Sequence, residues 1–154
     1  MKKFIQFCLA AFMLVGFAAC NGPSETDPRD VFVGAYAYEA TGNIEFDLAP
    51  LHWDIPLNEQ GILTISKVGD KDKVVIKGYN DSIEASVSGN QLILENNTYN
   101  TNYGDIELQL TFLYGKATLT DRQLTWETDV KGIGRYSSYS AVGEGHVSMV
   151  ANKQ

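Results

Sequence analysis

The sequence predicts an all-β domain, an antiparallel up-and-down meander of about eight to ten strands closing into a β-barrel, with a β-sandwich as the alternative. Three observations support this fold class. Apolar and polar residues alternate over short segments, turn-forming Gly, Asn and Asp separate these segments, and no segment after residue 20 keeps a helical period. Short connections favour antiparallel neighbours, and closure removes the exposed edges of an open meander.

The clearest strand runs from Ile106 to Phe112, where large apolar residues alternate with Glu107, Gln109 and Thr111. The links between the segments contain residues that accept positive φ or form Asx turns, so neighbouring strands reverse direction within a few residues. The expected strands lie near residues 32–39, 43–48, 61–67, 73–78, 82–88, 91–96, 105–113, 115–120, 123–130 and 141–150.

One face of these strands is apolar and is predicted to point into the barrel. The inward residues are Phe32, Tyr36, Leu63, Ile65, Val74, Ile76, Ile83, Val87, Leu108, Leu110, Phe112, Leu119 and Trp126. A barrel of eight strands is either filled by its side chains or holds one small ligand, and both alternatives stay open here. A hollow interior of this composition favours an apolar guest, such as a lipid or pigment fragment, with Tyr36, Phe112 and Trp126 as candidate ligand-binding residues.

The N-terminus has the parts of an export signal, with Lys2 and Lys3 followed by an apolar run from Phe4 to Phe17. As a helix this run of about 14 residues spans about 21 Å, which is shorter than the ~30 Å hydrocarbon core of a bilayer. We therefore expect the run to be a cleaved signal and not a permanent membrane span.

The segment Phe17-Ala18-Ala19-Cys20 resembles the lipobox of bacterial lipoproteins, in which lipid is attached to the cysteine sulfur before cleavage. The resemblance implies a signal peptide over residues 1–19, acyl chains such as palmitate on Cys20, and a lipid-anchored protein of the outer membrane, on its periplasmic face or the cell surface. The alternative is a plain signal peptide in which the cysteine is incidental. A flexible polar tether is expected over residues 20–30, and the folded domain over residues 31–154.

Charge and cysteine content restrict the partners of the mature chain. The formal charge is −7, and removal of residues 1–19 takes away two lysines and no acidic residue, which leaves about −9. An acidic domain repels nucleic acid and anionic headgroups, so the expected membrane contact is the covalent lipid alone. Cys8 leaves with the signal, so no thiol remains for a disulfide, a nucleophile or a metal site once Cys20 carries lipid.

The stretch from Asp30 to Tyr36 has a Gly-x-aromatic pattern at Gly34 and resembles the first strand of lipocalin-like (calycin) barrels. In that family the aromatic is usually Trp and a late cation covers it; here the resemblance implies Tyr36 with Arg135 as its cover. The pair of segments 61–67 and 73–78 resembles the central hairpin of small, calycin-like lipoproteins of Gram-negative gut commensals. These resemblances imply a fold and a compartment and no reaction.

The remaining motifs give two further hypotheses and no catalytic site. Tyrosines among small polar residues, Tyr99, Tyr103, Tyr136 and Tyr139, form a candidate surface for an envelope protein or a sugar, so a structural or interaction module with a filled barrel is the alternative function. Asp81-Ser82-Ile83 resembles a bacterial O-glycosylation site, which makes Ser82 a candidate acceptor. No hydrolase, phosphate-loop or zinc motif occurs, so we expect no enzyme, cofactor or metal site.

Overall fold

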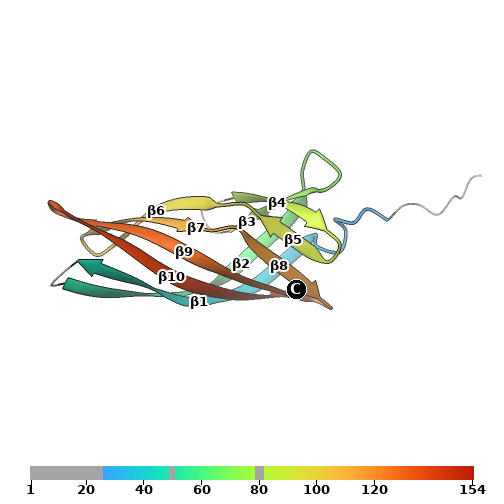
Figure 1. Cartoon of the computed structure of the whole chain (residues 1–154). Helices are drawn as coiled ribbons and strands as arrows, with labels where there is room; N and C mark the ends of the chain where they lie inside the picture. Colours follow the sequence, from blue (N-terminus) through green and yellow to red (C-terminus); the bar gives the residue numbers. More distant parts are fainter. Residues whose placement is uncertain (1–25, 49–50, 79–81) are drawn as a thin grey trace, which may run out of the picture.

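The computed structural model describes residues 26–48, 51–78 and 82–154, which form strands and turns (Figure 1). All the strand pairs are antiparallel. The strands are β1 (Gly34–Leu48), β2 (Leu51–Lys67), β3 (Lys73–Lys77), β4 (Ser82–Ser88), β5 (Gln91–Leu94), β6 (Asn97–Tyr103), β7 (Ile106–Phe112), β8 (Gly115–Thr120), β9 (Gln123–Tyr136) and β10 (Tyr139–Lys153).

Eight of the strands form a closed barrel, which confirms the predicted fold class. They follow the order β10-β1-β2-β3-β4-β5-β8-β9, and the pairing of β10 with β9 completes the circuit. The hairpin of β6 and β7 does not enter this circuit, because β5 pairs directly with β8 and β7 pairs with β9. The two extra strands continue the sheet beyond the barrel.

Strand β9 changes its neighbour halfway along its length. It pairs with β8 over Gln123–Glu127 and with β7 over Val130–Arg135. At the branch, the Thr128 hydroxyl donates a 2.8 Å hydrogen bond to the Leu113 carbonyl, and the Leu113 amide donates a 2.9 Å bond to the Asp129 carbonyl. These bonds satisfy polar groups where the sheet divides.

The branch separates a closed half from an open half of the molecule. In the open half, the ends of β1, β2, β9 and β10 continue past the barrel with β7 and β6 beside them (Figure 1). Among the described residues, β2 has β3 beside it only over Thr64–Lys67, and the outer edge of β6 has no strand beside it. The open half is therefore a curved sheet with two free edges.

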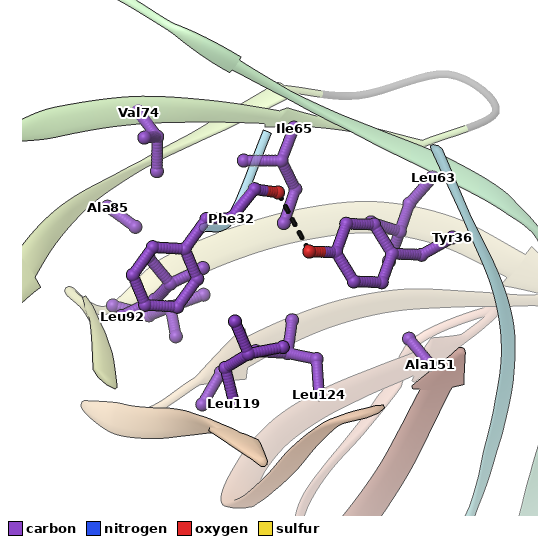
Figure 2. Packing of buried hydrophobic residues seen from close by; sticks show 12 residues of the cluster. Phe32, Tyr36, Leu63, Ile65, Val74, Ala85, Leu92, Leu119, Leu124 and Ala151 are labelled. Atoms are coloured by element: carbon purple, nitrogen blue, oxygen red, sulfur yellow. Dashed lines mark hydrogen bonds between the residues drawn. The ribbon is translucent and has the colours of Figure 1, made fainter. Parts of the chain in front are cut away.

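Each half has its own apolar core, and every residue predicted to point inward belongs to a core or packs against one. The core of the closed half, shown in Figure 2, consists of Phe32, Tyr36, Leu63, Ile65, Val74, Ala85, Leu92, Leu94, Ala117, Leu119, Leu124 and Ala151. The core of the open half consists of Ile44, Phe46, Ile55, Leu108, Leu110, Val130, Ala141 and Val147. Both cores therefore lie on the inward face of the sheet.

The end of the barrel from which the N-terminal segment leaves is sealed by a turn over residues 27–33. The Arg29 side chain is buried there and donates hydrogen bonds to Asp27 and, at 2.7 Å, to the Asp70 carbonyl in the β2–β3 turn. Phe32 fills the space beneath and is fully buried. Residues 27–30, which were predicted to belong to the tether, are thus folded onto the barrel, because their polar groups find partners in it.

The Asp27 carboxylate bonds to the Arg29 guanidinium and forms a 2.9 Å ion pair with Lys67. The Arg29 bond, followed by that to Lys67, holds the pKa of this carboxyl well below its usual range. A pKa that is lower in the folded than in the unfolded state stabilises the fold above the unfolded value, near pH 4, and the contribution is lost as the pH falls toward the folded pKa.

We therefore expect Asp27→Asn to remove part of the loss of stability that acid causes in the wild type. Urea unfolding at pH 6, 4 and 3 measures this, with the wild type losing more free energy of unfolding than the variant between pH 4 and pH 3. Glu95→Gln, which removes an exposed carboxyl outside the strands, controls for the change in net charge. Parallel acid profiles of wild type and Asp27→Asn would contradict the assignment.

Candidate functional site

A cavity of about 620 Å³ lies where the two cores meet. Its walls come from both cores and from both free edges of the open half, with β2 on one side and β6 on the other. The lining residues are Tyr38, Ala40, Leu57, Glu59, Leu63, Ile76, Gly78, Ile83, Leu94, Tyr99, Asn100, Thr101, Leu110, Phe112, Ala117, Leu124, Trp126, Val147 and Met149. Most of these side chains are aliphatic or aromatic, so the interior suits an apolar guest.

The cavity exists because the sheet branches. Strands β8 and β7 pair with successive parts of β9, on either side of Thr128. The interior therefore widens where the closed half ends. Residues on the two branches face the same space, with Ala117 on β8 and Phe112 on β7. The inward alternation of β9 then places Trp126 between them.

Three aromatic rings form one wall of the cavity. The Tyr99 and Phe112 rings meet edge to face with their centroids 5.5 Å apart, and the Phe112 and Trp126 rings are tilted by 38° at 6.3 Å. Both separations lie in the range in which aromatic pairs attract one another. Met149 is paired with Trp126 across the β9–β10 ladder and adds a flexible thioether that adapts to the shape of a guest.

The orientation of Trp126 depends on a glycine. Its indole Nε1 is buried and has no hydrogen-bond partner among the described residues. A Cβ atom at position 115 would collide with this nitrogen, so only Gly115 leaves room for the indole edge against β8. Sequence reasoning did not identify Gly115 as part of the site; the one signal was a glycine at the start of an alternating segment.

One charged side chain, that of Glu59, is among the residues that line the cavity. It is exposed, and it is paired in the β1–β2 ladder with Ala40, which also lines the cavity. The nearby Tyr38 ring lies over Gly61, where a Cβ atom would approach it to 3.0 Å. Burial raises the pKa of the Tyr38 phenol, and the negative charge of Glu59 raises it further. The Tyr38 phenol and the Glu59 carboxylate are therefore close enough to interact electrostatically.

The structure brings two of the three predicted ligand-binding residues together. Phe112 and Trp126 line the cavity, but Tyr36 does not. Tyr36 is fully buried in the core of the closed half, where its hydroxyl donates a 2.8 Å hydrogen bond to the Phe32 carbonyl (Figure 2). Alternation predicts which face a residue is on and not its depth along the barrel, so it did not show that Tyr36 packs in this core and not at the cavity.

The cation that covers the Tyr36 ring is Lys153, not Arg135. The Lys153 ammonium lies 5.8 Å from the ring centroid and donates a 2.9 Å hydrogen bond to the Val31 carbonyl. Arg135 is exposed near the tip of β9, paired in the ladder with Glu107. Position 153 comes beside Tyr36 because β10 pairs with β1 in a register that the sequence does not specify.

The other predicted sites lie at the surface or outside the described residues. Cys20, the predicted lipid attachment site, and Asp81 of the candidate glycosylation motif lie outside them, while Ser82 begins β4 and is exposed. Tyr103, Tyr136 and Tyr139 are 50%, 47% and 59% exposed. They are at the tips of two adjacent hairpins and not in long loops.

Histidines and acidic residues do not form a metal centre in the described part of the chain. No group of three or more His, Cys, Asp or Glu side chains there is arranged to hold an ion. His52 lies 2.7 Å from Asp47, and this hydrogen bond, with the charge of Asp54, raises the histidine pKa. His146 lies 3.0 Å from Asp129. Both pairs are on the outer face of the sheet and are exposed.

Comparisons with known proteins do not identify the chain. A scan against protein-family models, a search of curated proteins and a search of solved structures each return no match. Within the described residues, no helix has the length and apolar character needed to cross a bilayer. A functional interpretation therefore starts from the cavity and its surroundings.

Proposed function

We propose that the protein is a lipid-anchored, non-catalytic protein of the cell envelope that binds a small apolar ligand. The observation that supports binding is the cavity of about 620 Å³ with its aromatic wall. This volume lies within the range of about 300–1,000 Å³ that is typical of small-molecule sites. Each 100 Å² of apolar ligand surface removed from water contributes about 2.5 kcal/mol before the costs of association.

The sealed end of the barrel suits a membrane anchor on Cys20. Asp27, the first residue of the sealing turn, follows Cys20 by seven positions, so the connection spans at most about 25 Å. The tips of the β6–β7 and β9–β10 hairpins lie at the other end of the molecule from residues 26–33 (Figure 1). An anchor at Cys20 would keep the sealed end near the bilayer and direct the open half away from it.

Filling the cavity tests ligand binding. We expect Ala40→Phe to weaken binding of a neutral apolar probe, decanol, by about tenfold or more, because the added ring would occupy the space beside Glu59 and Leu57. Isothermal titration calorimetry below the solubility limit of the probe measures the affinity. Ala37→Phe is the matched control, since Ala37 is on the outward face of the same strand.

Decanol affinity that is equal in the wild type and in Ala40→Phe would contradict binding at this site. Decanol affinity that falls equally in both variants would point to a general loss of structure. Circular dichroism spectra of the three proteins separate that second outcome from a local effect.

The exposed tyrosines support a second candidate function, an interaction module that binds an envelope protein or a glycan. Tyr136 and Tyr139 face each other across the β9–β10 hairpin, and Tyr103 ends β6 on the far side of β7. On the opposite, outer face of these strands, Asn100, Asn102, Gln109 and Arg135 contribute to a separate shallow depression of about 330 Å³. A function carried by this surface would survive Ala40→Phe, which distinguishes it from ligand binding in the cavity.

A further inference from the structure

Glu59 occupies a position that the alternation of β2 reserves for apolar residues. Side chains of a strand point to opposite faces in turn, so Glu59 faces the same side as Ile55, Leu57, Leu63 and Ile65. Ile55, Leu63 and Ile65 are buried in the two cores. The chain thus places one carboxylate on an inward face that is otherwise apolar.

The packing of the protein itself does not use this carboxylate. No hydrogen bond or ion pair joins Glu59 to another side chain among the described residues. Within the described part of the chain, no Lys, Arg or His side chain lines the cavity, so none of these residues neutralises the charge. Glu59 is exposed, so a guest that covered its carboxylate would have to replace the hydrogen bonds that the carboxylate makes in water.

We propose that the cavity selects amphiphilic amines, molecules with an apolar body and a cationic head, through an ion pair with Glu59. This inference rests on the proposed ligand-binding function and adds the chemical class of the ligand. The apolar body would lie against Phe112 and Trp126, and the ammonium group would reach the carboxylate at the boundary with solvent. A fatty acid would bring its own carboxylate beside Glu59 and would be repelled.

Two features of the protein favour a ligand with a cationic head. Tyr38 also lines the cavity, close enough to Glu59 for the carboxylate to raise the pKa of its phenol, and the faces of aromatic rings attract ammonium groups. The formal charge of −7 also raises the local concentration of cations around the whole chain. This general attraction is not specific to the cavity, so a test must separate it from the effect of Glu59.

Three probes with the same ten-carbon chain test the inference: decylamine, decanol and decanoate, titrated by calorimetry at pH 7.4 below their micelle concentrations. We expect the wild type to bind decylamine roughly three- to tenfold more tightly than decanol, and decanoate more weakly than decanol by a similar factor. In Glu59→Gln, decylamine affinity should fall to the level of decanol, and decanoate affinity should rise toward it.

Glu39→Gln is the matched control, because it removes the same charge from the outward face of β1, in the ladder pair next to that of Glu59. It should leave the order of the three probes unchanged. Equal affinities of the three probes, or decanoate binding most tightly, would overturn the amine preference while leaving the binding function intact. A preference for decylamine that survives Glu59→Gln would also overturn it. Failure of all three probes to bind would instead contradict the proposed function itself.

Discussion

Replacing Phe46 with alanine is expected to lower the free energy of unfolding by about 3–5 kcal/mol, the range for a fully buried phenylalanine. Phe46 is completely buried and is the largest side chain in the core of the open half. Its ring lies against Gly132 and Gly143, and a Cβ atom at either position would approach the ring to 2.6 Å. Because glycines have no side chains to move into the vacated space, the cavity left by the substitution would persist.

Urea denaturation followed by circular dichroism measures this loss. Tyr114→Ala is the matched control, since it removes an aromatic ring that is 56% exposed and should change stability by no more than about 0.5 kcal/mol. A loss below about 1 kcal/mol for Phe46→Ala would show that the open half contributes little to the stability of the chain.

Replacing Cys20 with alanine is expected to abolish membrane attachment. The thiol is the predicted acceptor of the acyl chains, and the acidic domain offers anionic headgroups no electrostatic attraction. The variant should appear in the soluble fraction or as an unprocessed precursor, and it should incorporate no labelled palmitate. The barrel should still fold, because the residues that seal it begin at Asp27.

Fractionation of cells expressing each variant gives the result, with Cys8→Ala as the control, because Cys8 lies in the segment predicted to be removed. Cys8→Ala should stay in the membrane fraction at the wild-type level. A Cys20→Ala protein that is cleaved normally and remains membrane-bound would contradict lipid anchoring.

Alternation predicted the strands whose inward faces are apolar, and it failed where the inward face is polar or small. β7 was found because Ile106, Leu108, Leu110 and Phe112 share one face. β6 was missed because most of its residues are Asn or Thr, only Tyr99 and Tyr103 on its inward face are large, and it is held mainly by its ladder with β7. The hydrogen bonds of a partner strand do not depend on side-chain type, so they leave no pattern in the sequence.

Several strands are longer than predicted, and a glycine and a proline lie in two of the segments that differ. The break expected between residues 39 and 43 does not occur, since β1 runs through Gly42, where the His146 carbonyl lies too close for any Cβ atom. Residues 51–60 were not predicted to form a strand, but β2 runs through them and includes Pro56. That proline is accommodated because this part of β2 has a partner on one side only. The close approach of the His146 carbonyl to Gly42 and the position of Pro56 at a sheet edge both depend on how the strands pair, which the sequence alone does not show.

The candidate site was predictable only in its chemistry. Phe112 and Trp126 were identified as inward aromatics, and an apolar guest followed from their type. The cavity itself depends on β9 exchanging β8 for β7, which is a long-range choice between partners. Glu59 was overlooked because no strand was expected at its position. Without a strand, alternation could not assign its side chain to the inward face.

The branch in β9 also has a consequence for how the protein unfolds. β1, β2, β9 and β10 each contribute residues to both cores, so neither half can lose its ladders without exposing apolar surface in the other. A shift of β9 by one residue would turn Leu124 and Val130 outward together, one from each core. We therefore expect the two cores to unfold together as one cooperative unit, with neither half unfolding before the other.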